Sequence, residues 1–316
     1  MTFADWLRES KHKIDDYGLS GGVQSAALDL WGGFARRACH RLGLDQSGTG
    51  IYERDWDVLV VLDTCRTDVL AEVADEYDFL PERIPAFTSL GSTSWEWMAD
   101  NFNETYREEI ARTAYVTGNA HTRRLGDEFE ADPEWFGLLD EVWEYAWDDE
   151  FDGIPPRPVT DRAIDAMRTR DPERLVVHYM QPHAPYRSLD MDWSVGDQQD
   201  ADAGKVWDLL QIGELSHEEV WAAYRDNLRW VLDDVELLLE NIDAETVVLT
   251  ADHGEAFGEW GLYGHYRHVP ISVLKEVPWV TTSATDSGTY EPETETADAD
   301  LTGDDVQQRL QALGYR

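Results

Sequence analysis

The chain has 316 residues and a formal net charge of −39, because 65 acidic residues outnumber 26 Lys and Arg residues. This charge argues against nucleic acid as a partner, since binding of the phosphate backbone relies on Lys and Arg, and Cys39 and Cys65 are too few for a disulfide framework. No stretch approaches the roughly 20 apolar residues of a membrane span, and the N-terminus lacks the apolar core of a signal peptide. We therefore expect a cytoplasmic protein with room for one large α/β domain.

The basic residues include few lysines, namely Lys11, Lys13, Lys205 and Lys275. Acid-rich, lysine-poor surfaces resemble those of proteins from salt-loving archaea, in which salt screens the repulsion between like charges. The composition therefore predicts a halophilic protein, and it carries no information on the chemistry.

Residues 1–50 differ from the rest, because basic and acidic residues nearly balance there as far as Gly43. Apolar residues recur at helical spacing before a basic turn, namely Val23, Ala26, Ala27, Leu30, Trp31, Phe34 and Ala35. We predict an N-terminal helical extension over residues 1–50. Its helix either packs on the flank of the main domain or lies on a partner or a membrane surface, which would make the protein membrane-peripheral.

Two apolar runs lead into carboxylates. Residues 58–62 read Val-Leu-Val-Val-Leu and precede Asp63, and residues 246–249 read Thr-Val-Val-Leu and precede Asp252 and His253. Short continuous apolar runs are typical of strands buried on both faces of a parallel sheet. Because ligands of open α/β sheets bind outside the carboxyl ends of the strands, we expect both carboxylates at one sheet edge.

Hydroxyl groups precede the predicted helix over residues 95–102. A helix over residues 67–77 follows the first strand, where Arg66 and Asp68 form either a pair that orients Asp63 or a surface salt bridge. A loop then reaches three hydroxyl residues before a helix over residues 95–102, namely Ser92, Thr93 and Ser94. Capping uses one hydroxyl. The others lie where the helix dipole favours an anion or an alkoxide.

The middle of the chain continues the α/β pattern. We predict strands over residues 115–119, 174–180 and 277–280, helices over residues 164–170 and 221–242, and a solvated insertion over residues 126–152. Pro182 and Pro185 fix His183 beyond the 174–180 strand, and His265 lies in the Gly-punctuated loop 257–268. Residues 51–280 therefore predict a three-layer α/β/α sandwich with a mostly parallel central sheet.

The last residues read differently. Residues 281–300 are rich in Thr, Ser, Asp and Glu and predict an acidic linker. Residues 301–316 predict a C-terminal helix, formed by residues 304–313 with Gly314 as its C-cap.

The predicted sheet edge suits a divalent cation. Asp63, Asp252 and His253 offer two carboxylates and an imidazole, which fit Mg, Mn, Ca or Zn without a thiolate. A hydroxyl bound to such a cation loses its proton more easily and becomes a nucleophile, a role open to Thr93 or Ser94. His183 and His265 are candidates to contact the oxyanion or to protonate the leaving group.

The ordered set of segments resembles a known family. The segments are, in order, Asp63 after an apolar strand, a hydroxyl at a helix start, residues 181–186 (QPHAPY), and residues 251–255 (ADHGE) with a later Gly-His. This set resembles the alkaline phosphatase superfamily. Within that superfamily, it is most similar to the sulfatases and to the phosphoglycerol transferases of the lipoteichoic acid synthase type. The resemblance implies an alkaline phosphatase-like fold and one divalent metal. The implied ligands are Asp63, Asp252, His253 and the nucleophile Thr93, with His183 and His265 at the transferred group.

The chain also departs from the family pattern. Sulfatases carry a Cys or Ser in a CxPSR or SxPSR motif that becomes formylglycine, whereas residues 93–96 here read Thr-Ser-Trp-Glu. This favours phosphate over sulfate esters, with Thr93 or, in an alignment shifted by one residue, Ser94 as the nucleophile. Residues 259–261 read Glu-Trp-Gly where relatives often have Glu-His-Gly, which favours one metal over two.

The resemblance therefore implies a metal-dependent hydrolase or transferase that acts on a phosphate ester of a sugar, a polyol or a lipid head group. Two alternatives stay open. One is a non-catalytic sulfatase-like protein that binds a metal or a glycan anion. The other is a membrane-peripheral phosphoglycerol-type transferase that docks on lipid through residues 1–50.

Overall fold

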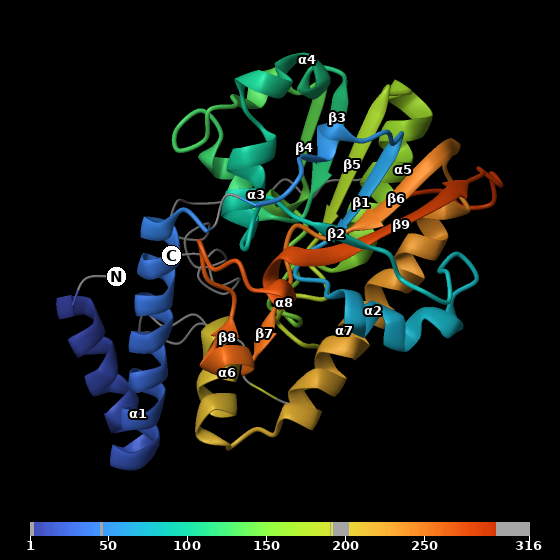
Figure 1. The fold of residues 1–316 in the computed structure, drawn as a ribbon. Helices are drawn as coiled ribbons and strands as arrows, with labels where there is room; N and C mark the ends of the chain where they lie inside the picture. Colours follow the sequence, from blue (N-terminus) through green and yellow to red (C-terminus); the bar gives the residue numbers. More distant parts are fainter. Residues whose placement is uncertain (1–2, 45–46, 190, 192–201, 295–316) are drawn as a thin grey trace.

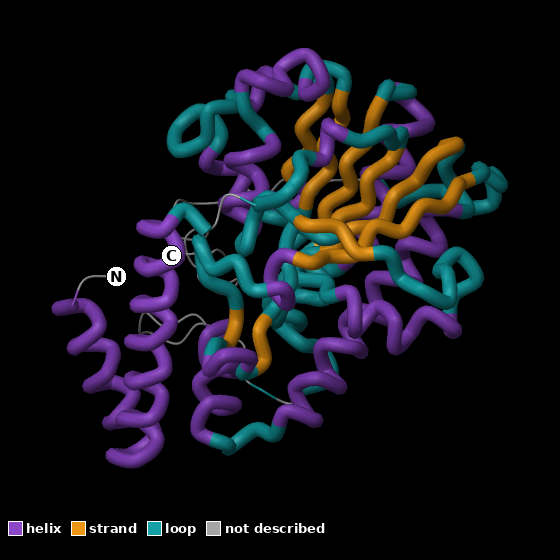
Figure 2. The backbone as a smooth tube through the Cα atoms, in the orientation of Figure 1, coloured by secondary structure: helices purple, strands orange, loops and turns teal. Residues whose placement is uncertain are grey.

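The computed structural model describes residues 3–44, 47–189, 191 and 202–294. Within them, seven strands form one central sheet (Figures 1 and 2). In spatial order they are β2 (Ala86–Thr88), β9 (Glu276–Ala284), β6 (Ala244–Thr250), β1 (Val58–Leu62), β5 (Arg174–Tyr179), β3 (Thr113–Thr117) and β4 (Leu138–Glu141). The pairs from β6 to β4 are parallel, and β9 runs antiparallel to both β6 and β2.

Helices cover both faces of this sheet. Three helices pack on one face, namely α2 (Thr67–Val73), α5 (Pro156–Arg170) and α7 (His217–Leu239). The opposite face carries α3 (Ser94–Asn101) and α4 (Arg107–Ile110). Short 3-10 helices connect these elements, namely η1 (Ile51–Glu53), η2 (Ala74–Glu76), η3 (Glu104–Tyr106), η4 (Ala120–Arg124), η5 (Pro133–Trp135), η6 (Val142–Glu144) and η7 (Glu259–Gly261).

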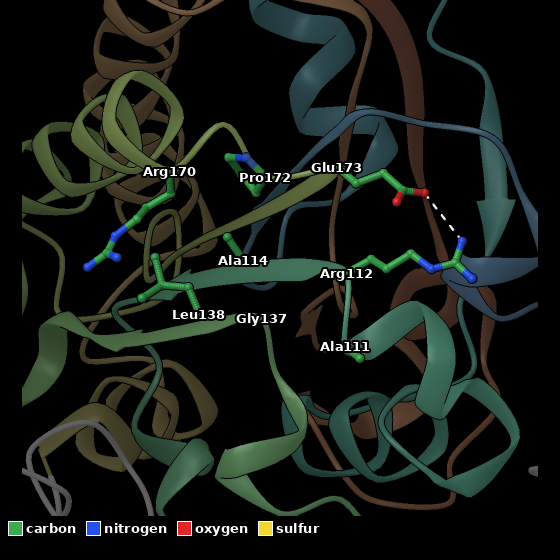
Figure 3. A pocket seen from close by; sticks show the side chains of 8 residues that line it. All are labelled: Ala111, Arg112, Ala114, Gly137, Leu138, Arg170, Pro172 and Glu173. Atoms are coloured by element: carbon green, nitrogen blue, oxygen red, sulfur yellow. Dashed lines mark hydrogen bonds and ion pairs between the residues drawn. The ribbon is translucent and has the colours of Figure 1, made fainter.

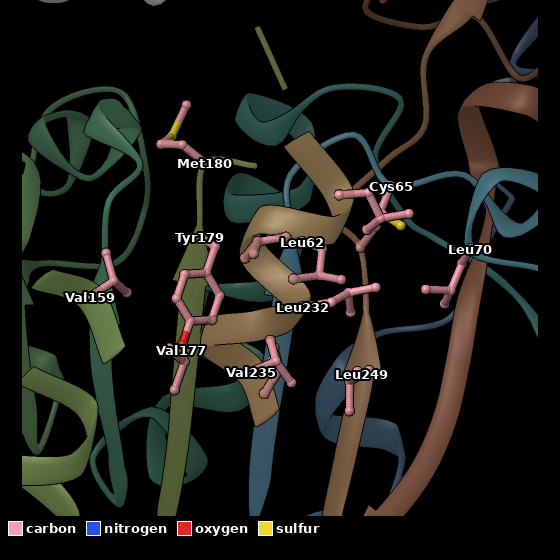
Figure 4. Packing of buried hydrophobic residues seen from close by; sticks show 14 of the residues in the cluster. Leu62, Cys65, Leu70, Val159, Val177, Tyr179, Met180, Leu232, Val235 and Leu249 are labelled. Atoms are coloured by element: carbon pink, nitrogen blue, oxygen red, sulfur yellow. The ribbon is translucent and has the colours of Figure 1, made fainter. Parts of the chain in front are cut away.

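Strand β1 shows why its sequence is continuously apolar. Val58, Val60 and Leu62 point into the cluster under α2, α5 and α7, whereas Leu59 and Val61 point into the cluster under α3. Figure 4 shows the first cluster, with Leu62 of β1 beside residues of α7. Both faces of the strand are thus buried. The predicted three-layer α/β/α sandwich with a mostly parallel sheet is confirmed.

The N-terminal residues form a helical hairpin. Helix α1 (Phe3–Leu42) is interrupted at Gly18, whose φ of 72° lies in the left-handed region, and two helical segments run side by side (Figure 1). The Lys13 ammonium group lies 2.5 Å from Asp29 and 2.6 Å from Asp208 of α6 (Asp202–Ile212), so one buried cation joins the hairpin to the main domain. Among the described helices, none is long and apolar enough to cross a bilayer.

Two predicted segments differ from the structure. Residues 126–152 were expected as a solvated insertion, but they contain β4, which extends the sheet beside β3, and they bury Trp143. The predicted boundary at residue 280 falls inside β9, because β9 continues to Ala284 and pairs with β6. Residues 295–300 of the predicted linker and the predicted C-terminal helix lie outside the described residues.

Three further elements complete the fold. Strands β7 (Ala256–Phe257) and β8 (Tyr263–Gly264) form a small separate hairpin after β6. The short helix α8 (Ser272–Lys275) leads into β9. All three lie in or just after the loop that carries the predicted residue His265.

Candidate metal and nucleophile site

The candidate site lies at the carboxyl edge of the three central strands. Asp63 follows β1, Asp252 lies two residues after β6, and His178 is next to last in β5. Because β6, β1 and β5 are neighbours, their ends bring these side chains together. The structure thus places both predicted carboxylates at one sheet edge.

Two carboxylates and two imidazoles meet there. His253 Nε2 lies 3.7 Å from Asp63 Oδ1 and 3.5 Å from Asp252 Oδ2. His178 Nε2 lies 3.7 Å from Asp252 Oδ2 and 3.9 Å from Asp63 Oδ2. All four side chains are buried. Asp63, Asp252 and His253 can each direct one ligand atom to a common point, since these atoms lie within 4.8 Å of one another.

This cluster fits a divalent cation. Asp63 Oδ1 and Asp252 Oδ2 are buried and have no hydrogen-bond partner among the described residues. Burial, reinforced by the nearby Asp252 charge, raises the pKa of Asp63 well above its usual range. Buried carboxylates without a compensating charge are costly, and oxygen atoms with an imidazole are ligands for Mg, Mn, Ca or Zn. The residues present therefore suit the predicted ion.

Of the two candidate nucleophiles, Ser94 lies inside the cluster. Its Oγ donates a hydrogen bond of 3.3 Å to Asp63 Oδ2 and lies 3.3 Å from His253 Nε2. Thr93 is the N-cap of α3, and its Oγ1 accepts a hydrogen bond from the backbone N–H of Glu96. Thr93 thus carries the capping hydroxyl, and the next residue, Ser94, carries the hydroxyl that faces the carboxylates.

A second group of ionisable residues adjoins the first. Ligand atoms of His183, Glu255 and His265 lie within 4.8 Å of one another, and the rings of His265 and His253 are 4.5 Å apart. His265 Nδ1 lies 2.9 Å from Glu255 Oε1. Burial alone would lower the pKa of His265, but the Glu255 carboxylate raises it above the ordinary value. Burial, together with His265, lowers the pKa of His183 to about 4.

The different pKa directions give these histidines different roles. His265 favours the imidazolium form and can donate a proton, whereas His183 stays neutral. The Nδ1 atom of His183 bonds the Ala184 carbonyl oxygen, which leaves Nε2 for the group with Glu255 and His265. The predicted residues His183 and His265 therefore lie beside the predicted metal ligands.

The turn after Asp63 is strained. Thr64 is β-branched yet has a φ of 66°, a conformation that costs about 1–3 kcal/mol and persists where neighbours impose it. Its N–H donates to Asp252 Oδ1 at 3.2 Å, and its carbonyl oxygen accepts a 2.6 Å hydrogen bond from the Tyr224 hydroxyl of α7. The strain is thus held by the second carboxylate of the site and by the longest helix over that face.

Close backbone packing positions the loop that follows β6. A Cβ atom on Gly254 would lie 2.1 Å from the Val273 carbonyl oxygen, so only glycine fits directly after His253. Arg66 is buried and binds Asp68, Glu259 and the Glu255 carbonyl oxygen. These contacts fix the 255–259 loop, and none of them is with the Asp63 carboxylate.

Three polar residues of the site escaped the sequence analysis. His178 sits inside the apolar run of β5, Asn119 was expected only as the end of a strand, and Glu255 only as part of a motif. Asn119 Nδ2 donates to Asp63 Oδ2 at 2.8 Å. The Tyr115 hydroxyl lies 2.8 Å from His178 Nδ1. A histidine inside an apolar run is no functional signal by itself, so the sequence did not single out His178.

A hollow elsewhere on the sheet carries no comparable chemistry. Its volume is about 570 Å³, and it lies at the amino ends of β3, β4 and β5, opposite the Asp63 edge (Figure 3). An ion pair of 3.3 Å between Arg112 and Glu173 crosses its rim. It is lined by Ala111, Arg112, Ala114, Gly137, Leu138, Arg170, Pro172 and Glu173.

Comparison with known proteins gives structural matches alone. No family model matches the chain, and no curated protein matches it. The fold is similar to the soluble domain of lipooligosaccharide phosphoethanolamine transferase A from Neisseria meningitidis, with a TM-score of 0.49 and 14% identity over 77% of this chain and 81% of that one.

Two other solved structures are similar at lower scores. A putative sulfatase from Bacteroides thetaiotaomicron has a TM-score of 0.41 and 13% identity over 82% of this chain and 71% of that one. A protein in the alkaline phosphatase superfamily from Vibrio parahaemolyticus has a TM-score of 0.39 and 11% identity over 83% of this chain and 67% of that one. These similarities concern the course of the backbone and assign no activity to this chain.

Proposed function

We propose that the chain is a metal-dependent phosphotransferase or phosphoesterase that uses Ser94 as its nucleophile. One observation carries the proposal. The Ser94 hydroxyl lies 3.3 Å from both Asp63 and His253, next to two buried carboxylate oxygens that have no hydrogen-bond partner among the described residues. A structural hydroxyl needs no such surroundings, whereas an alcohol activated for attack does.

Asp63, Asp252 and His253 would hold one Mn, Mg, Ca or Zn ion. When bound, such an ion lowers the pKa of a nearby hydroxyl and stabilises the charge that develops on a phosphoryl oxygen. His178 lies outside this set, and its Nε2 atom, which has no hydrogen-bond partner among the described residues, lies within 4 Å of both carboxylates.

The residues account for each bond and proton of a two-step transfer. The Ser94 Oγ–phosphorus bond forms while the bond to the leaving oxygen breaks. Asp63 Oδ2, which accepts the Ser94 hydrogen bond, takes the hydroxyl proton, and the His265 imidazolium protonates the leaving oxygen. Water or an acceptor alcohol then forms a bond to phosphorus and gives its proton to His265, while the bond between phosphorus and Ser94 Oγ breaks and Ser94 regains its proton from Asp63.

Phosphate esters suit this site better than sulfate esters. The start of α3 carries ordinary alcohols, Thr93 and Ser94, and residues 93–96 lack the cysteine and arginine of the formylglycine motif. An ordinary serine or threonine forms a stable phosphoryl ester, which resembles the covalent intermediate of phosphatases and phosphotransferases.

Turnover and covalent labelling test the proposal. With Mn²⁺ present, wild type should hydrolyse bis-p-nitrophenyl phosphate or p-nitrophenyl phosphate and should carry a phosphoryl group on the peptide that contains Ser94. Ser94→Ala should lose both, while Thr93→Val should fold less stably by about 1 kcal/mol and still be labelled. Labelling of Ser94→Ala on Thr93 would assign the nucleophile to Thr93. Metal binding without turnover or labelling would indicate the non-catalytic alternative.

A specific surface supports the membrane-peripheral variant of this function. In the second segment of α1, Leu19, Val23, Leu30 and Phe34 are exposed and follow one another at spacings of four, seven and four residues, which is one helical face. Trp260, 79% exposed, joins this surface, because its carbonyl oxygen accepts a hydrogen bond from the Trp31 indole.

The same helical face ends in positive charge. Arg37 and Arg41 continue the stripe in a chain whose net charge is −39. Apolar and aromatic side chains beside arginines match the interface of an anionic bilayer. We propose that the α1 stripe docks on such a bilayer, so that the substrate is a lipid head-group ester. Wild type should co-sediment with phosphatidylglycerol vesicles, the double variant Leu30→Gln/Phe34→Gln should not, and the control Leu7→Gln, at another exposed position, should behave as wild type. Equal sedimentation of the three proteins would refute the docking proposal.

A further inference from the structure

Four basic side chains gather at the start of α3, although the chain as a whole is strongly acidic. They are His121 and Arg124 of η4, Arg267 of the loop after His265, and Arg36 of α1. Burial, reinforced by Arg124 and Arg267, lowers the pKa of His121, and burial with Arg124 and Arg36 lowers the pKa of Arg267. Each of these groups is therefore within electrostatic range of another one.

Direct contacts fix two of the arginines around Trp95. The Arg267 guanidinium lies 4.1 Å from the centre of the Trp95 ring. The Trp95 indole donates to Glu128 Oε2 at 3.1 Å, and the other oxygen of Glu128 pairs with Arg124. Arg124 Nε also lies 3.3 Å from His121 Nδ1. Arg267 thus contacts Trp95 directly, and Arg124 is linked to it through Glu128, from two distant parts of the sequence.

This cationic group is continuous with the candidate nucleophile site. Trp95 directly follows Ser94, and Arg267 lies two residues after His265. On the other side, Asn119 is the N-cap of η4 and also donates to Asp63. The same backbone segments therefore position the reacting groups and the arginines.

We propose that Arg124 and Arg267 bind a second anionic group of the substrate, a phosphate beyond the phosphoryl group that is transferred. Guanidinium groups bind phosphate oxygens in a bidentate manner, and they do so best where water is partly excluded. Glu128 pairs with Arg124, and the Glu96 carboxylate lies within electrostatic range of Arg267. With Arg36 also in range, three arginines face two carboxylates, and the group retains one positive charge for a ligand. This inference rests on the proposed function for its substrate class, a phosphate ester that carries a second phosphate on the same polyol or head group.

A binding measurement tests this second anion site independently of catalytic turnover. Isothermal titration of the full-length chain in Mn²⁺ would compare glycerol 1-phosphate with glycerol 1,3-bisphosphate, using the Ser94→Ala variant so that neither probe is consumed. We expect the bisphosphate to bind about tenfold more tightly, which corresponds to about 1.4 kcal/mol. Arg267→Gln and Arg124→Gln should reduce this preference to near equality, and Arg267→Lys should restore part of it.

Arg107 offers a matched control. Its guanidinium lies 4.2 Å from the centre of the Trp135 ring, so Arg107→Gln removes the same charge and the same kind of contact away from the site. This variant should keep the preference, and melting temperatures would identify any variant that fails to fold. Equal binding of both probes by the Ser94→Ala protein, or an equal loss in Arg107→Gln, would overturn the proposal. A preserved preference without turnover of any ester would refute the proposed function alone, and turnover without the preference would refute the subsite alone.

Discussion

Asp63→Asn should change stability in opposite directions with and without a divalent cation. Without the cation, burial and the Asp252 charge raise the pKa of Asp63. Because the folded-state pKa lies above the unfolded value, the folded chain binds this proton more tightly, and the resulting stability is lost as pH rises through the folded-state pKa. Neutral pH lies above the unfolded-state pKa, so this carboxyl group lowers the stability of the folded chain there, and Asp63→Asn removes that cost.

The expected size follows from the surroundings of the two carboxylates. Asp63 Oδ1 and Asp252 Oδ2 are buried without a hydrogen-bond partner among the described residues, and such a group costs about 1–3 kcal/mol. The metal-free variant should be more stable than wild type by that amount, or about 2–6 °C in melting temperature. With the cation at a hundred times its dissociation constant, wild type should gain about 2.7 kcal/mol. The variant, which lacks a charged ligand, should gain little.

Differential scanning calorimetry in EDTA and in Mn²⁺, at high salt and pH 7, measures this reversal. Asp55→Asn is the matched control, because Asp55 is exposed and lies before the same strand; it should behave as wild type in both solutions. A variant of Asp63 that is less stable than wild type by the same amount in both solutions would refute the reasoning, since the carboxylate would then be structural and independent of a cation.

Other predictions test the remaining contacts. Glu255→Gln should lower the pKa of His265, because the Glu255 carboxylate is the main group that offsets the effect of burial. Since His265 donates its proton as an imidazolium, the basic limb of the pH profile of kcat/KM should move to lower pH. An unmoved limb would exclude His265 as the acid. Gly254→Ala should reduce the unfolding free energy in urea by about 1–3 kcal/mol, because its Cβ would lie 2.1 Å from the Val273 carbonyl oxygen; an unchanged midpoint would contradict this packing. Lys13→Met should leave two largely buried carboxylates unpaired at a cost of about 3 kcal/mol. Limited proteolysis should then cut the N-terminal hairpin before the main domain, whereas an unchanged cleavage pattern would show that Lys13 does not hold it.

The central strands were predictable because both of their faces are buried. The runs before Asp63 and Asp252 are continuous and apolar, and the structure pairs β1 with β6 in parallel. The edge strand β4 was not predictable in the same way. It is only half-buried, and its sequence reads Leu-Leu-Asp-Glu, so neither alternation nor a continuous apolar run marks it.

The predicted side chains at the sheet edge meet, but their neighbours were not identifiable. Asp63, Asp252 and His253 come together because strand ends define their positions. His178 reaches the same point from inside β5, and a histidine within an apolar run carries no functional signal by itself. Helix capping explains why Ser94 and not Thr93 faces the carboxylates, since the capping hydroxyl is turned toward the backbone of its own helix. Sequence spacing cannot show which residue starts that helix.

Anomalous diffraction from a crystal soaked in Mn²⁺ tests the central claim most directly. We predict one strong manganese peak at about 2.0–2.6 Å from oxygen atoms of Asp63 and Asp252 and from His253 Nε2, with the Ser94 hydroxyl beside it. A fully occupied peak elsewhere, with the two carboxylates unchanged and no density between them, would contradict it.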